Sequence, residues 1–429
     1  MKKLLLLALL LAGIASVEAQ FVTVRNHQFI LNGQPYYYIG TNYWYGSLLP
    51  LEKDLNRGIN RLRRELDQLK ALGVTNLRVL AGAEGEGLVQ GVERVGPALQ
   101  PEKGKFNEGV LKGLDILLVE MKKRNMKAIV FFSNNWEWSG GFIQYLRWNN
   151  VISEETFRKK LDWDELRDVV SKFYSCAPCL EDYNKHMNVV LNHTNHLTGK
   201  KYTEDPTIMA WELANEPRPM RPAANEAYAK WIADVSAAIK KKAPKQLVTL
   251  GHEGTIGTAD DELYERIHLD KNVDYLTIHI WPKNWGWFTH TDSTEQVKNA
   301  YKLSAEYVEK HVQLARKLKK PLVIEEFGWN RDSMVYSHKG ATATRDEYYR
   351  QIFSEWLKHK QTGDVIAGAN FWAYGGDARP IPGQDFKKKG DEWMGDPPME
   401  QQGLYSVFSS DSSTLKLIRS FTKPVTDQR

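Results

Sequence analysis

The chain has 429 residues, with 58 Lys and Arg against 53 Asp and Glu, so its net charge of +5 is small and widely spread. This balance argues against nucleic-acid binding and against a basic membrane-binding surface. The length exceeds a usual single core. An α/β barrel with long loops nevertheless reaches it as one domain, which we expect for residues 20–429.

The first 19 residues have the pattern of a secretory signal peptide. Met1-Lys-Lys3 is a positive start, the apolar run Leu4 to Leu11 is too short to span a membrane, and Ala19 ends a small-residue cleavage motif. We therefore expect a soluble, exported monomer, located in the periplasm or outside the cell.

Strand-like and helix-like segments alternate along the rest of the chain. Residues 21–25 and 28–31 alternate around Asn26-His27, and a turn follows at 32–35, which predicts a hairpin that closes the base of the domain. Eight apolar, strand-like runs follow at 36–41, 76–80, 128–132, 208–213, 247–250, 275–280, 322–324 and 366–372. Helical patterns lie between them at 59–72, 109–124, 183–197, 226–242, 260–268, 295–318 and 346–359.

Apolar strands that alternate with amphipathic helices predict a parallel sheet covered on both faces. Eight repeats favour a closed (β/α)8 TIM barrel over an open doubly wound sheet, and no Gly-x-Gly-x-x-Gly motif follows the first strand. The long connections all follow strands. They would therefore stand together at the C-terminal face of the barrel, where enzymes of this fold place their sites.

The only two cysteines are Cys176 and Cys179, in the sequence Cys-Ala-Pro-Cys. This spacing occurs in redox motifs and in halves of zinc sites, but the sequence contains no second cysteine pair and the expected compartment is oxidising. We therefore favour a local disulfide.

Two of the apolar runs end in glutamates. Residues 208–213 lead into Asn215, Glu216 and Pro217, and residues 322–324 lead into Glu325 and Glu326. Each glutamate alone could be a solvated loop residue. Two strand-end carboxylates on separate strands, however, are what a glycosidase needs, because one must protonate the leaving oxygen while the other attacks the sugar or activates water.

Further polar and aromatic residues gather at the same strand ends. Arg78, Asn215 and His279 are candidates for supporting the carboxylates. Tryptophans offer flat apolar platforms for a pyranose ring, and amides can bind its hydroxyls. The predicted substrate-binding residues are Asn42, Trp44, Asn134, Asn135, Trp136, Trp281, Trp285, Trp287 and Trp372.

With these motifs, the chain resembles glycoside hydrolase family 5, and within it the endo-β-1,4-mannanase branch. The resemblance runs from about Gly33 to Trp372, and its most specific block is 205–218. Other matching stretches are 75–82, 134–136 with Gly140 and Gly141, 195–202, 251–254 and 326–328. The resemblance implies a retaining (β/α)8 hydrolase of β-mannan that needs no cofactor or metal.

Carried over residue by residue, the resemblance makes Glu216 the acid/base and Glu326 the nucleophile. It assigns catalytic support to Arg78, Asn215, His279 and Trp372. One position departs from the family pattern: the usual His-x-Tyr reads His279-Ile-Trp281, so an indole that can donate but not accept replaces a phenol. The role of this position is open.

Two further glutamates lie near the predicted pair. Alternation along a strand places Glu325 on the face opposite Glu326, toward the helices or an ion pair there. The same rule places Glu212 on the face of Glu216, as a possible partner of Arg78.

Three functions remain open at this point. An enzyme that cuts inside β-1,4-mannan, glucomannan or galactomannan is the leading interpretation. An exo-acting mannosidase or mannobiohydrolase would use the same glutamates and differ in loops that block one end of the cleft. A non-catalytic glycan-binding protein would keep the tryptophans, but both glutamates argue against it.

Overall fold

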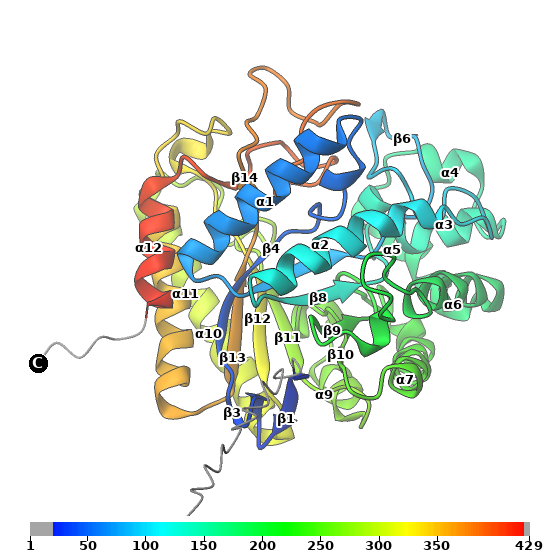
Figure 1. Ribbon diagram of the computed structural model, residues 1–429, viewed down its shortest axis with the longest axis horizontal. Helices are drawn as coiled ribbons and strands as arrows, with labels where there is room; N and C mark the ends of the chain where they lie inside the picture. The colour runs from blue at the N-terminus through cyan, green and yellow to red at the C-terminus, as the bar shows by residue number, and fades with distance from the viewer. Residues whose placement is uncertain (1–19, 424–429) are drawn as a thin grey trace, which may run out of the picture.

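The computed structural model describes residues 20–423, so the predicted signal peptide lies outside the described residues (Figure 1). Its centre is an eight-stranded sheet in the order β10-β9-β8-β5-β4-β13-β12-β11, and every neighbouring pair is parallel. Backbone hydrogen bonds join the two end strands: Asp274 N donates to Val248 O at 2.8 Å, and His279 N to Glu253 O at 3.0 Å. The sheet thus closes on itself, as the predicted (β/α)8 barrel requires.

The barrel strands lie where the apolar runs predicted them, because strands buried on both faces leave a continuous apolar signal. They are β4 (Tyr38–Asn42), β5 (Asn76–Leu80), β8 (Lys127–Phe131), β9 (Ile208–Glu212), β10 (Leu247–Thr249), β11 (Leu276–Ile280), β12 (Leu322–Phe327) and β13 (Ile366–Phe371). The helices that follow them in turn are α1 (Leu55–Leu72), α2 (Leu111–Lys123), α6 (Ala177–Leu191), α7 (Asn225–Lys242), α9 (Asp261–Leu269), α10 (Thr294–Leu318), α11 (Ala343–Thr362) and α12 (Ser412–Thr422). Within residues 20–423, no helix combines the length and apolar character needed to cross a bilayer.

The predicted hairpin lies below the barrel (Figure 1). It consists of β1 (Thr23–Arg25) and β2 (Gln28–Leu31), and the segment predicted as a turn adds a third strand, β3 (Gln34–Pro35). The ring of Phe29 meets Tyr275 edge-on at 5.1 Å, so the hairpin closes the bottom of the barrel interior.

Long connections stand at the opposite end and contain short elements that the sequence did not predict. These are β6 (Leu88–Val89), β7 (Val92–Glu93), α3 (Gly141–Trp148), α4 (Glu154–Arg158), α5 (Trp163–Val170), α8 (Thr255–Thr258), β14 (Tyr374–Gly376) and β15 (Val407–Phe408). Local caps hold the short helices: Ser153 caps α4, and Asp162 forms a capping box with Glu165 on α5.

The third outer helix, α6, begins and ends about six residues earlier than the predicted 183–197. Cys176 caps its first turn, where Pro178 is tolerated because the first N–H groups of a helix have no partner within it. Cys176 and Cys179 are joined in a disulfide with their Cα atoms 5.2 Å apart.

Glu84, in the loop after β5, gives the stability of this fold a pH dependence. Burial raises the pKa of Glu84 from 4.5 to about 7, although Tyr145 Oη donates to it at 3.0 Å. Because the pKa of Glu84 is higher in the folded than in the unfolded state, its contribution to the free energy of unfolding is fully present below pH 4.5. That contribution is lost as the pH rises through 7. We expect the wild type to lose roughly 3 kcal/mol relative to Glu84→Gln between pH 4.5 and 8. Urea unfolding of both proteins across that range measures the difference, and parallel pH curves would contradict it.

Candidate active site

The first carboxylate comes from the loop that leaves β9. Glu216 has a positive φ of 51°, a conformation that costs a non-glycine residue energy and that folded proteins concentrate at functional sites. Its N–H donates to Gly251 O at 2.8 Å, and Asn215 N–H donates to Ser133 O at 2.8 Å. Backbone bonds to the loops on either side therefore fix the side chain of Glu216 over the barrel mouth.

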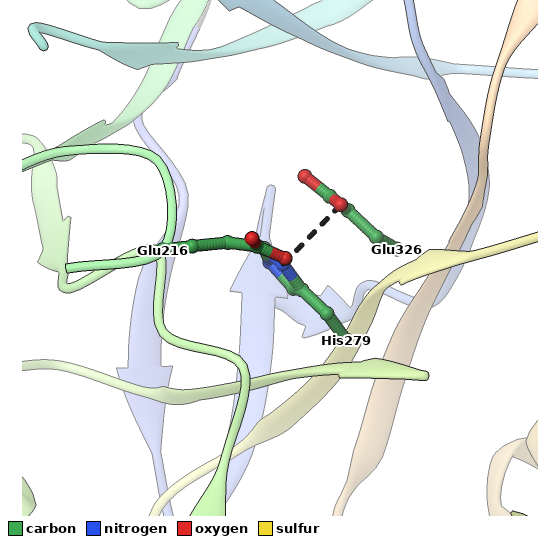
Figure 2. A group of neighbouring side chains, drawn as sticks. All are labelled: Glu216, His279 and Glu326. Atoms are coloured by element: carbon green, nitrogen blue, oxygen red, sulfur yellow. Dashed lines mark hydrogen bonds and ion pairs between the residues drawn. The ribbon is translucent and has the colours of Figure 1, made fainter. Parts of the chain in front are cut away.

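Glu216 faces Glu326, the fifth residue of β12, across the side chain of His279. Figure 2 shows the three side chains pointing toward one another. Nδ1 of His279 lies 2.7 Å from Oε1 of Glu216 and 3.3 Å from Oε2 of Glu326, and ligand atoms from all three groups lie within 4.8 Å of one another. The sequence predicts catalysis without a metal, although these three groups are also a set that could hold a metal ion.

Arg78 lies beneath this pair, fully buried in the barrel. Its guanidinium donates to Glu326, to Glu212 at 2.9 and 3.1 Å, and to the side-chain oxygens of Asn42 at 3.1 Å and Asn215 at 2.9 Å. The predicted contact between Arg78 and Glu212 is present, and Arg78 connects the strands that carry the two carboxylates.

Burial dominates the electrostatics of the site. It raises the pKa of Glu216, while Arg218 and the indole of Trp136 lower it. Burial also raises the pKa of Glu326, an effect that Arg78 opposes and negative charge on Glu216 reinforces. Burial and Arg78 hold the pKa of His279 well below its usual range, so the imidazole is neutral.

An indole donates to the carboxylate of Glu216: Trp136 Nε1 lies 2.5 Å from Oε2. Trp281, in the position where the family pattern has a tyrosine, lines the cavity together with Glu216. Its ring meets Trp372 edge-on at 5.7 Å and Tyr405 at 4.9 Å.

A cavity of about 950 Å³ opens over the two carboxylates. The loops after β8, β9, β10, β11 and β13 contribute to its lining, and β12 itself contributes Glu326. Of the predicted residues it contains Asn215, Glu216, Glu326, Trp136, Trp281, Trp285, Trp287 and Trp372.

Four residues predicted to bind substrate lie behind this surface instead. The side chain of Asn42 donates to Glu325 O at 2.9 Å, and Asn134 accepts from Asn215 at 3.1 Å. Trp44 is fully buried, and its indole donates to Gly395 O at 2.8 Å. Asn135 is 1% exposed. The strand-end pattern locates such residues near the mouth of the barrel but does not distinguish the lining from the layer that supports it.

Glu325 also departs from its predicted orientation. Ile278 pairs with Ile324, but the next residue, His279, pairs with Glu326, so Glu325 is the extra residue of a β-bulge. Because of this bulge, the side chains of Glu325 and Glu326 do not point to opposite faces of the strand. The carboxylate of Glu325 therefore lies inside the barrel, 3.5 Å from Nε2 of His279.

Several lining residues were not among the predicted site residues. Arg218 forms a double hydrogen bond with Glu253 through its Nε and NH2 groups, and its guanidinium lies 5.2 Å from the ring of Trp136 and 5.4 Å from that of Trp163. Glu400 reaches the cavity from the loop after β13, and burial raises its pKa to about 8. Trp163 and Glu400 carried no strand-end signal because both come from the middle of long loops.

Trp163 is 49% exposed and lies at the rim of the cavity, at the start of α5. If the cavity takes the β-mannan chain that the family resemblance implies, Trp163→Ala should lower kcat/KM on mannotetraose by about tenfold, because a sugar far from the reacting bond loses its platform. Mannobiose should be cleaved nearly as before. Trp163→Phe, which keeps an aromatic face, is the matched control. An equal loss on both substrates would indicate a folding defect.

A closed βα barrel with two buried carboxylates facing each other at its mouth defines a barrel glycoside hydrolase. The family model of glycoside hydrolase family 5 β-mannosidase-like proteins matches residues 19–429. The chain therefore belongs to this family, as its motifs predicted.

Individual relatives agree with this family assignment. The putative mannan endo-1,4-beta-mannosidase 9 of Oryza sativa subsp. japonica is 30% identical over 384 residues, which cover 85% of this chain and 84% of the relative. The crystal structure of the glycoside hydrolase family 5 mannosidase from Rhizomucor miehei is 35% identical, with a TM-score of 0.83, and the match covers 94% of this chain and 96% of that one. The endo-1,4-beta-D-mannanase from Thermotoga petrophila, 24% identical with a TM-score of 0.66 and with 90% and 99% covered, shares the fold.

Proposed function

We propose that this protein hydrolyses β-1,4-mannosidic bonds with net retention, with Glu216 as acid/base and Glu326 as nucleophile. The observation that carries the proposal is the short gap between the two carboxylates, which have oxygens within 4.8 Å of each other. Retaining glycosidases hold their carboxyls about 5 to 5.5 Å apart, whereas inverting enzymes leave at least about 6.5 Å for a water molecule. The mannan specificity follows the names of the relatives.

The surroundings of the two carboxylates match these roles. Arg78 donates directly to Glu326 and so favours its ionised form, whereas Glu216 has no contact of this kind with Arg78. Arg218 and the indole of Trp136 favour the charged form of Glu216, and burial raises the pKa of Glu326 well above its usual value. We give more weight to the direct hydrogen bond from Arg78 and propose that a single proton shared by the pair resides on Glu216, where a leaving oxygen needs it. Once Glu216 is neutral, its charge no longer opposes ionisation of Glu326.

The cavity supports attack at chain ends. Departing sugars must lie on the side of Glu216, and there the lining continues over residues 218–222 and 256–260. On the side of β4, Trp44 packs edge-on against Trp138 at 5.3 Å and Trp393 at 5.7 Å, which joins the loops after β4, β8 and β13. We propose that this packing leaves room for one mannose before the cleaved bond, so that the enzyme releases mannose from non-reducing ends.

Internal cleavage of mannan is the second candidate, favoured by the names of the curated relatives. Product analysis on mannohexaose separates the two. An exo enzyme releases mannose from the first time point and leaves the viscosity of galactomannan unchanged, whereas an endo enzyme produces mannobiose and mannotriose and lowers viscosity early. An early fall in viscosity would overturn the exo proposal. If the protein cleaved no β-mannosidic bond at all, both the exo and the endo proposal would be overturned.

We also propose that the protein is exported, on the strength of residues 1–19. Expression in a bacterial host with the full sequence should yield a mature protein that begins at Gln20 and lies outside the cytoplasm. N-terminal sequencing of cell fractions tests this, and an intact Met1 in the cytoplasm would contradict it.

A further inference from the structure

Three carboxylates surround one guanidinium beneath the active site. Arg78 lies 2.9 Å from Glu212 and 3.7 Å from Glu325, and it contacts Glu326 directly; all four side chains are buried. If all three glutamates were ionised, the group would carry two uncompensated negative charges in a medium that solvates them poorly. Burial of that kind is costly, so a proton on one glutamate is favoured.

The geometry indicates which glutamate holds that proton. Arg78 donates to both oxygens of Glu212 and to Oε1 of Glu326, and each of these hydrogen bonds favours a carboxylate. Glu325, at 3.7 Å from the nearest guanidinium nitrogen, lies beyond hydrogen-bonding distance of Arg78. Oε2 of Glu325 instead faces Nε2 of His279 at 3.5 Å, and no group among the described residues donates to its Oε1, so Glu325 lacks the charged donor that favours ionisation of the other two glutamates.

We propose that Glu325 is a positioning residue, held as a neutral carboxylic acid, so that the charge of Arg78 is reserved for Glu212 and Glu326. The nucleophile then keeps its hydrogen bond from Arg78 without a third negative charge beside it. An oxygen of Glu325 also faces Nε2 of His279 at 3.5 Å, and the other nitrogen of that ring contacts both catalytic carboxylates. Burial and the charge of Glu212 raise the pKa of Glu325, in agreement with the neutral form.

This proposal rests on the proposed hydrolysis. It predicts that the same change, Glu to Gln, is tolerated at Glu325 but lowers kcat strongly at Glu212. Glu325→Gln keeps one donor and one acceptor without charge, so kcat on an aryl β-mannoside should stay within about tenfold of wild type. Glu325→Ala removes both groups and lets Arg78 and His279 move, and it should cost about 100-fold. Glu212→Gln, the matched control, removes the ionised partner of Arg78 and should cost at least as much as Glu325→Ala.

Infrared spectroscopy gives a readout that does not depend on activity. Near neutral pH, the wild type should show a protonated-carboxyl band that Glu325→Gln lacks and that Glu212→Gln retains. A missing difference between wild type and Glu325→Gln would overturn the proposal, as would Glu325→Gln being as inactive as Glu325→Ala at equal thermal stability. If wild type itself cleaves no β-mannoside, the proposed function fails, and the infrared comparison still decides the state of Glu325.

Discussion

Glu216→Ala should lower kcat on mannan or mannooligosaccharides by about 10²- to 10⁴-fold, the usual contribution of a positioned general acid and base. An alkoxide is a poor leaving group, so cleavage of a sugar–sugar bond needs the proton that Glu216 supplies. An aryl β-mannoside with an acidic phenol needs little protonation, and its first step should survive. The second step still lacks a base, so stopped-flow measurement should show a burst of phenol followed by slow turnover.

The comparison between the two substrates tests the role rather than the presence of Glu216. Equal loss of the burst rate and of mannan hydrolysis would contradict the assignment. Trp136→Phe is a useful control, because it removes the indole N–H that donates to Glu216 at 2.5 Å and leaves the carboxyl in place. This variant should lower both steps modestly and leave no burst.

Glu326→Ala should lower turnover by at least about 10³-fold on every substrate, because no leaving group can compensate for a missing nucleophile. A 2-deoxy-2-fluoro-β-mannosyl fluoride should leave a covalent adduct on the wild-type peptide that contains Glu326. The adduct should be absent from Glu326→Ala. NMR should show the β-anomer as the first product from a β-mannoside.

Several outcomes would contradict this second prediction. An α-anomer formed first would mean inversion and would reverse the role of Glu326. Loss of activity in a chelator, restored by a divalent ion, would show that Glu216, His279 and Glu326 hold a metal. A label on a peptide without Glu326 would move the nucleophile elsewhere.

The barrel could be predicted because its signal is local. A strand such as β5 is buried along its whole length and contains the apolar residues Leu77, Val79 and Leu80, and residues 76–80 were predicted with the same bounds. Glu216 and Glu326 were recognisable because ionisable groups directly after an apolar strand are costly unless they have a partner or a use. Their proximity to His279 then follows from the closure of the barrel.

Other features depend on contacts that a single sequence does not contain. The bulge at Glu325 exists only in the pairing of β11 with β12, so strict alternation predicted the wrong side of the strand. Trp44 and Trp285 look alike in sequence, but the first is covered by the loop that carries Gly395 and the second lines the cavity. The burial of a loop residue depends on distant segments of the chain. The sequence therefore predicted correctly only some of the tryptophans that line the cavity.

Closure of the barrel has a consequence for the order of events during synthesis. Residues 40 and 41 pair with 370 and 371, and the hairpin below is held to the segment before β13 by Gln28 Nε2, which donates to Gly363 O at 2.5 Å. At about 5 to 20 residues per second, the first barrel strand waits tens of seconds for its partner. During that wait one edge of β4 is open, so the nascent chain needs protection from wrong pairing until nearly all of it has left the ribosome.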